Sequence, residues 1–154
     1  MVAVATLLTG DDLVARAEAA AAVALPDALG VEFLDHDDPL VGVRFTVRGL
    51  AVTPAATLHS AALGAAMELA GYLAVLPTLD VAEHAVSHHV ATQHLRPAHA
   101  GQVVRVTGHL DRRGRGLAFV STTAEIDEAA GGSARAGRRS VVALAQITKS
   151  IVSA

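Results

Sequence analysis

The chain has 154 residues, contains no cysteine and carries a formal net charge of −3. This length suits one domain with a hydrophobic core of its own, and the absence of cysteine excludes disulfides, thiolate nucleophiles and cysteine-ligated metal sites. Aromatic residues make up only 3% of the sequence and we find no basic stripe, so nucleic acid is not an expected partner.

The N-terminal region predicts a helix over roughly residues 10–24. Asp11 and Asp12 follow Thr9 and suit the first turn of a helix, while Pro26 and Gly30 are typical of its end. The alanine-rich stretch is interrupted by charge and no basic region precedes it, so it fits neither a signal peptide nor a membrane anchor. We therefore expect a cytoplasmic protein.

Two strands are predicted next. The segment "GVEFLD" is expected to form a short strand, and after the turn at residues 37–39 the sequence alternates in polarity. Val41, Val43, Phe45 and Val47 share one parity, while glycine, arginine and threonine take the other. This pattern predicts a strand with one buried face.

A long helix is predicted over about residues 57–76. The segment "TLHSAALGAAMELAGYLAVLP" has no polar stripe and stops at Pro77, which is typical of a helix buried on all sides. It is long enough to cross a membrane, but His59 and Glu68 inside it, and the lack of a similar segment elsewhere, favour a buried helix and no membrane partner. Its many small residues would let neighbouring backbones approach closely.

Four strand-like stretches follow, over residues 85–98, 102–110, 116–126 and 140–147, with turns at residues 111–116 and 129–139. The last stretch, "SVVALAQI", is an unbroken apolar run and predicts a strand covered on both faces. Together the elements predict one α+β domain over residues 1–154, with an antiparallel sheet curled around one central helix.

Local motifs in this arrangement resemble those of the hotdog-fold acyl-CoA thioesterases. The helix of that family typically begins with a His-Gly-Gly element and carries an acidic residue nine positions after the histidine, as His59 and Glu68 are spaced here. The strand after the helix often begins with threonine, where this chain has Ser87, and runs to a Leu-Arg-Pro-Ala ending, present as "LRPA" at residues 95–98. The segment from residue 100 to residue 120 is similar to the family's next strand, basic turn and strand.

The chain also departs from the family pattern. Ser60 and Ala61 stand where two glycines are usual, and Thr53 stands where asparagine or glutamine is common. The similarity is therefore to a phenylacetate-pathway-like branch or to an uncharacterised branch that carries glutamate. It implies a hotdog fold with five or six antiparallel strands around one long helix, and acyl-CoA thioester hydrolysis between protomers.

The spacing of His59 and Glu68 has a geometric consequence. Nine residues of α-helix advance about 13.5 Å and turn the helix by about 180°, so these two side chains cannot meet within one chain. A site that uses both needs a second protomer, in agreement with the family's sites. We expect a homodimer, or a dimer of dimers that forms a homotetramer.

The candidate catalytic residues are Glu68, Ser60 and His59. Glu68 is the expected general base or nucleophile, and its apolar neighbours should raise the pKa of its carboxyl group. Unpaired backbone N–H groups near Ser60 and Ala61 would stabilise the oxyanion. The alternative for Glu68 is a buried ion pair with a strand arginine or histidine. His59 fits a helix cap better than a proton donor, and Ser60 lacks an evident base for a nucleophilic role.

Further residues are expected to contact the substrate. Tyr72 lies four residues after Glu68 and offers a hydroxyl group, and Arg112 and Arg113 suit the phosphates of CoA, although a solvated hairpin tip is an equal alternative for them. CoA enters as part of the substrate, and no separate cofactor is expected. The expected substrate-binding residues are Ala61, Thr53, Tyr72, Ser87, Arg112 and Arg113, and the acyl pocket is expected near Val90, Leu117 and Phe119.

The histidine-rich stretch is not expected to bind metal. His84, His88 and His94 share a parity on a regular strand, but the chain offers no cysteine partner and no recognised ligand spacing. Two other functions remain open. A hotdog protein that only binds acyl-CoA or serves as an assembly module is favoured by the missing glycines, and a hydratase would need an Asp–His arrangement that the sequence does not present.

Overall fold

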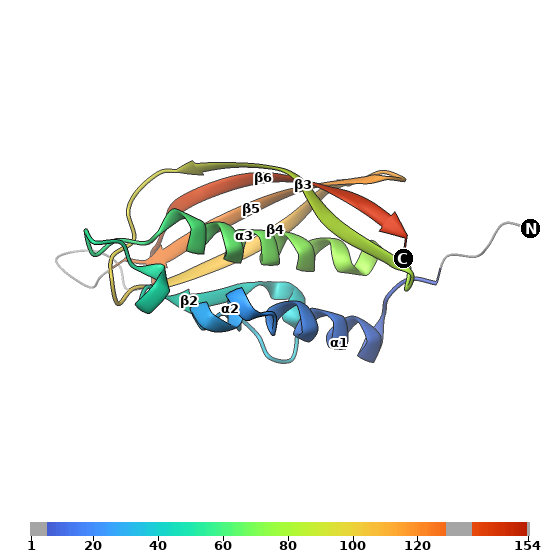
Figure 1. Ribbon diagram of the computed structural model, residues 1–154, viewed down its shortest axis with the longest axis horizontal. Coiled ribbons are helices and arrows are strands. Elements are labelled where there is room, and N and C mark those ends of the chain that lie inside the picture. Colours follow the sequence, from blue (N-terminus) through green and yellow to red (C-terminus); the bar gives the residue numbers. More distant parts are fainter. Residues whose placement is uncertain (1–5, 129–136, 154) are drawn as a thin grey trace, which may run out of the picture.

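The computed structural model describes residues 6–128 and 137–153, which contain one six-stranded antiparallel sheet with the order β1-β2-β4-β5-β6-β3. In Figure 1 strands β3, β5 and β6 arch over the long helix α3 (Ser60–Val75), and helices α1 and α2 lie on its other side. The predicted α+β arrangement is confirmed. The strands are β1 (Glu32–Phe33), β2 (Val43–Thr46), β3 (Glu83–His94), β4 (Val103–Arg113), β5 (Leu117–Asp127) and β6 (Arg139–Ser153).

The predicted N-terminal helix is two helices, α1 (Gly10–Ala21) and α2 (Ala24–Leu29). Pro26 explains the break, because its ring has no N–H to donate to the carbonyl of Ala22 and would clash with it in a continuous helix. Helix α2 ends at Gly30, whose left-handed φ of 66° lets the chain reverse at that point. The prediction of one helix over residues 10–24 was therefore wrong at its C-terminal end.

The predicted buried face is present at Val43 and Phe45 of β2 and at Val47, which follows the strand. Val41 does not belong to that face, because residues Pro39–Val41 form a 3-10 turn and leave the valine side chain 45% exposed. The predicted turn after β5 includes residues 129–136, which lie outside the described residues.

Helix α3 begins three residues later than predicted. Thr57 and Leu58 form isolated bridges with His99 and Val52, so these residues are extended, and His59 caps the helix. The helix buries Leu63, Met67 and Leu73 completely under the sheet. The segment from Ser60 to Thr78 is long and apolar enough to cross a membrane by composition, but 56% of its most apolar window is buried inside the fold.

The helix approaches the sheet closely at Gly108 of β4. A Cβ atom at this position would lie 2.3 Å from the carbonyl oxygen of Ala70 in α3, so only glycine fits. The close approach expected from the small residues of the helix therefore depends on a matching glycine in the sheet.

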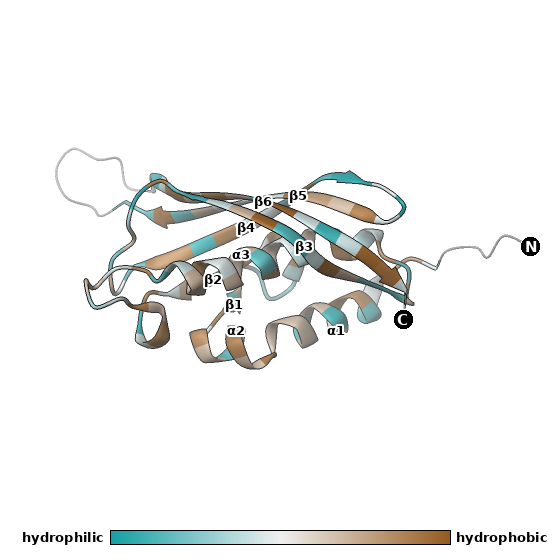
Figure 2. Cartoon of the chain, turned by 45° about the horizontal axis from the view of Figure 1, so that its top comes forward, coloured by the Kyte–Doolittle hydropathy of each residue, from teal (hydrophilic) through white to brown (hydrophobic). Residues whose placement is uncertain are grey.

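The long strands alternate between a face that packs on α3 and an outer face, as the alternating colours along them in Figure 2 show. The prediction that β6 is covered on both faces was wrong for this chain, since the side chain of Leu144 on the outer face is 41% exposed. The apolar run arises because Ala143, Ala145 and Ile147 face the helix while Leu144 remains on the outer side.

Strand β3 forms one edge of the sheet and pairs only with β6 among the described residues. A bulge at His88 shifts the register between Ser87 and His89, so the simple parity of the histidines does not hold. His94 pairs with buried Ala143 on the helix-facing side, whereas His84 pairs with exposed Val152 on the outer face. The expectation that His84, His88 and His94 share one face was wrong.

Candidate active site

Glu68 lies in the middle of α3 and contacts the edge strand. The hydroxyl of Ser87 in β3 donates a hydrogen bond to Oε2 of Glu68, and Nζ of Lys149 in β6 donates to the same hydroxyl at 3.0 Å. The serine of β3 thus bridges the carboxylate of α3 and the ammonium group of β6, so the three residues come from three different elements. The charged partner of Glu68 is a lysine, not the strand arginine or histidine considered from the sequence.

Lys149 is buried beneath the sheet, with 2% of its surface exposed. It is the only charged side chain among the fully buried described residues, and it is also the only lysine in the chain. Its position follows from the register, which pairs it with Ser87 on one side and with buried Ala118 on the other. Burial lowers the pKa of the Lys149 amine, and the nearby charge of Glu68 opposes that shift.

Tyr72 follows Glu68 by one helical turn and lies next to the same lysine. The centre of its ring is 6.0 Å from Nζ of Lys149, a distance at which an ammonium group is attracted to the face of an aromatic ring. Burial raises the pKa of the Tyr72 hydroxyl, and the Arg16 guanidinium from α1 opposes the shift. Tyr72 and Ser87, two of the expected substrate-binding residues, therefore surround the Glu68–Lys149 pair.

The N-terminus of α3 carries the second group of expected residues. Nδ1 of His59 accepts a hydrogen bond of 3.1 Å from the backbone N–H of Ala61, so the imidazole caps the helix. This bond occupies one of the N–H groups expected to bind the oxyanion. Ser60 is the first residue of the helix, and its N–H has no acceptor among the described residues.

A hollow of about 490 Å³ opens beside this helix end. Ser60, Thr53 and Arg96 line it together with His94, which projects from the end of β3. The Thr53 hydroxyl is hydrogen-bonded to the Thr57 hydroxyl at 2.8 Å, which fixes the loop before the helix. A titratable imidazole therefore lines the same space as Ser60, although we expected no such group near Ser60 from the sequence.

The residues around Glu68 and those around the N-terminus of α3 lie apart within one chain. Ser60 and Glu68 are eight residues apart on the same helix, which corresponds to about 12 Å along its axis. A carbonyl carbon would need to be about 3 Å from both the nucleophile and the oxyanion donors. One protomer alone therefore does not bring the expected catalytic groups together.

Arg112 and Arg113 end β4 at the hairpin that leads to β5, far along the sheet from Ser60. Arg113 is engaged, because its Nη2 lies 3.1 Å from the Glu83 carboxylate and its Nη1 donates to the carbonyl of Arg115. Arg112 is exposed and pairs across the hairpin with Phe119. Only Arg112 of the two is thus available to a phosphate without breaking an ion pair.

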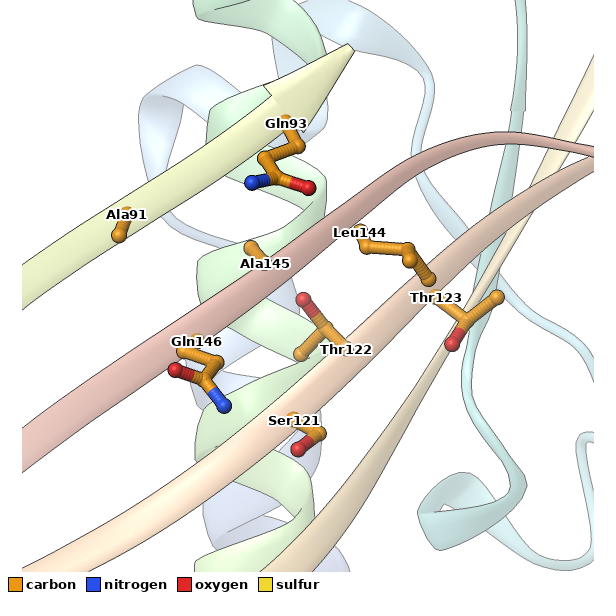
Figure 3. A pocket seen from close by; sticks show the side chains of 8 residues that line it. All are labelled: Ala91, Gln93, Ser121, Thr122, Thr123, Leu144, Ala145 and Gln146. Atoms are coloured by element: carbon orange, nitrogen blue, oxygen red, sulfur yellow. The ribbon is translucent and has the colours of Figure 1, made fainter. Parts of the chain in front are cut away.

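A second hollow, of about 430 Å³, lies on the outer face of the sheet. Figure 3 shows Gln93, Leu144 and Gln146 around it, with α3 passing behind the strands. It is separated from Glu68 by the sheet. Leu117 and Phe119 are on this outer side and are 37% and 41% exposed, so their expected place in a helix-side acyl pocket was wrong.

Metal binding finds no ready site in residues 6–128 and 137–153, where no three His, Cys, Asp or Glu side chains are grouped as metal ligands. His88 instead places Nδ1 3.0 Å from the Ser150 hydroxyl. Histidine side chains alone do not define a metal site. The candidate active site contains Glu68, Ser87 and Lys149 instead.

Sequence reasoning missed Lys149 and the position of His94. Lys149 follows Ala143, Ala145 and Ile147 at alternate positions, so continuing the helix-facing parity of the last strand by one step would have placed the only lysine of the chain inside the core. No pattern in the sequence located His94, because its direction depends on the bulge in β3.

Residues 55–143 of the chain match the family described as Fluoroacetyl-CoA-specific thioesterase. The matched segment contains Glu68, Ser60, Ser87 and His94, but ends before Lys149. No curated protein matches the sequence.

Solved structures of similar fold include several thioesterases. One from Haemophilus influenzae shares 18% identity with a TM-score of 0.69, covering 96% of this chain and 93% of its own. The PaaI protein of the phenylacetic acid degradation operon of Escherichia coli shares 19% identity with a TM-score of 0.65, covering 90% and 92%. A hypothetical thioesterase from Streptococcus pneumoniae, solved with coenzyme A, shares 17% identity with a TM-score of 0.64, covering 82% and 90%. These likenesses confirm the expected hotdog fold.

Proposed function

Because the chain belongs to the fluoroacetyl-CoA-specific thioesterase family, we propose that it hydrolyses an acyl-CoA thioester at a site built from two protomers. Family membership confirms the expected enzyme class, thioester hydrolase. The proposal adds the roles of individual residues: Glu68 acts as general base or nucleophile, and the backbone N–H of the partner's Ser60 binds the oxyanion.

The observation that most directly supports a shared site is that Glu68 lies beside β3, an edge strand of the sheet. Its carboxylate is hydrogen-bonded to Ser87 of β3, and β3 leaves one edge open among the described residues. If a second copy adds its β3 antiparallel to this edge, the His94 end of one strand lies beside the Ser87 end of the other. The N-terminus of the partner's α3 then approaches Glu68, which the eight-residue separation prevents within one chain.

The chemistry follows from these groups. As a general base, Glu68 takes a proton from water while the water oxygen attacks the thioester carbonyl carbon. The carbonyl oxygen gains negative charge and accepts a hydrogen bond from the helix N-terminus, where the positive end of the helix dipole adds to the stabilisation. The C–S bond then breaks, and the CoA thiolate takes up the proton to leave as a thiol beside the free acid. As a nucleophile, Glu68 would instead form an anhydride that water opens.

Substrate contacts complete the proposal. Ala61 and Thr53 would border the thioester at the helix N-terminus, and His94 lines the same hollow. Arg112 would bind a CoA phosphate, whereas Arg113 would have to exchange its ion pair with Glu83 to do so. The similar protein from Streptococcus pneumoniae was solved with coenzyme A, which supports this ligand class. The proposal includes a homodimer or dimer of dimers, a cytoplasmic location and no separate cofactor.

A non-catalytic acyl-CoA binder is the second candidate. The observation in its favour is that Ser60 and Ala61 stand where hotdog thioesterases usually have glycines, so two Cβ atoms border the expected approach of the thioester. His59 also occupies the N–H of Ala61. This candidate predicts tight binding of acyl-CoA without release of thiol.

Thiol release from a panel of acyl-CoA esters tests the proposal. We expect turnover by the wild type and a loss of about 10²–10⁴-fold in Glu68→Gln and Glu68→Ala, as for removal of a general base. Glu18→Gln, on the exposed surface of α1, is the matched control and should retain activity. Binding of acyl-CoA without turnover would favour the second candidate, while unchanged turnover in both Glu68 variants would exclude the mechanism. Light scattering should give a mass of at least a dimer at micromolar concentration.

A further inference from the structure

We propose that Lys149 is a positioning residue for Glu68: through the Ser87 hydroxyl, its ammonium group provides the counter-charge of the Glu68 carboxylate and fixes that carboxylate at the sheet edge. The inference deepens the proposed function and rests on it, since Glu68 is the acting carboxylate there. The residues between 55 and 143 that match the family do not include Lys149.

The direction of the hydrogen bonds supports this arrangement. A serine hydroxyl has one proton to donate, and Ser87 donates it to Oε2 of Glu68. The oxygen of Ser87 can then only accept, and it accepts from Nζ of Lys149 at 3.0 Å. The chain of bonds is complete with a protonated amine at one end and an ionised carboxylate at the other.

A buried ammonium group such as that of Lys149 requires a negatively charged partner. A lysine with 2% exposure has lost nearly all contact with water, and an uncompensated ammonium group in that position would be strongly unfavourable. The ionisable groups that face it are Glu68 and Tyr72 from α3, with Arg16 of α1 next to Tyr72. The neighbouring strands face it with Ser87 and Ala118, which carry no charge. Glu68 is therefore the counter-charge.

The expected direction of the effect follows from the distance. Two hydrogen bonds in series place the two charges within about 6 Å of each other, where an ammonium group stabilises a carboxylate. Replacing Lys149 by methionine should therefore move the acidic limb of the kcat/KM profile to higher pH.

The chain permits a matched chemical test because it has no cysteine. In the Lys149→Cys variant, the single thiol can be alkylated in denaturant with 2-bromoethylamine, which restores an ammonium group at nearly the length of lysine. Alkylation with 1-bromopropane gives a neutral side chain with the same number of heavy atoms. Both products are refolded beside wild-type protein that has passed through the same treatment, so a packing defect would affect the two alike.

Two readouts separate the outcomes. The pKa of Glu68 is measured by ¹³C NMR of the glutamate carboxyl carbons, assigned by the signal missing in Glu68→Gln, and the pH profile of kcat/KM is measured in parallel. We expect the aminoethyl form to match the wild type in both readouts, and the propyl form and Lys149→Met to show both transitions displaced to higher pH. Equal pKa values in the aminoethyl and propyl forms would overturn the inference. A raised pKa together with turnover that is indifferent to Glu68→Gln would support the coupling and refute the proposed function.

Discussion

Replacing Gly108 by alanine should destabilise the fold at the point where the helix that carries Glu68 meets the sheet. The new Cβ would lie 2.3 Å from the carbonyl oxygen of Ala70 and 2.8 Å from its carbonyl carbon, whereas ordinary contacts begin at 3.4 Å. Strand or helix must therefore move by about 1 Å, and the obstacle is backbone, which cannot rotate away. Overpacking of this kind costs about 3 kcal/mol at the upper end of its usual range.

A small gain offsets part of that cost. Alanine loses less backbone freedom than glycine on folding, which contributes about 0.5–1 kcal/mol in its favour. The net loss should be about 2–2.5 kcal/mol, or a fall of about 1 M in the urea midpoint for a slope near 2 kcal/mol/M. Gly64→Ala is the control, because this helical glycine has nothing within 4 Å of the new Cβ and should gain about 0.5–1 kcal/mol.

The assay is urea unfolding of both variants at one protomer concentration, since association would shift the midpoint. Opposite signs for the two substitutions would support the close approach of α3 and β4. A Gly108→Ala midpoint within experimental error of the wild type, or an equal loss in Gly64→Ala, would refute it.

Two further predictions concern titratable residues. His94 lines the hollow at the N-terminus of α3, so His94→Ala should reduce kcat by about 10²-fold. His84→Ala, on the outer face of the same strand, should leave kcat unchanged. Equal effects of the two substitutions in a thiol-release assay would contradict the position of His94 beside the thioester. Burial lowers the pKa of Lys149 below its ordinary 10.5, so the unfolded chain binds more protons in the window between the two values. Stability relative to Lys149→Met should therefore rise with pH across that window, and urea midpoints whose difference stays flat or falls would contradict this sign.

The sequence predicted most of the elements because each had a strong local signal. The alternation of apolar and polar residues in the strands and the unbroken apolar sequence of the helix around Glu68 are typical of buried elements. The structure contains these elements as β2–β6 and α3. The errors arose where a local pattern met a tertiary constraint. Pro26 breaks the predicted N-terminal helix into α1 and α2, and the bridges at Thr57 and Leu58 make α3 begin three residues later than predicted. The bulge at His88 reverses which face of the sheet the later residues of β3 lie on.

The site was only half predictable for a related reason. Glu68 was found as an isolated charge in an apolar helix, and Ser87 through the resemblance to a family motif. Lys149 lies in the last strand, and its contact with both depends on the order β5-β6-β3, which joins strands far apart in the chain. Local periodicity does not specify strand order, so the counter-charge of Glu68 could not be assigned from the sequence.

The central claim is that Glu68 of one protomer acts with the helix N-terminus of the other, and mixed dimers test it most directly. Ser60→Pro removes the N–H at the first helical position, where proline is tolerated, and His59 before it already has the extended φ of −71° and ψ of 128° that proline requires. Ser60→Ala, which keeps the N–H, is its control.

Ser60→Pro and Glu68→Gln should each be inactive alone. Refolded together in equal amounts, they should recover roughly a quarter of the wild-type thiol release, because half of the dimers are mixed and each mixed dimer has one intact site of two. The control mixture of each variant with itself should recover none. No recovery in the mixed sample, with heterodimers demonstrated by mass spectrometry, would contradict the shared site.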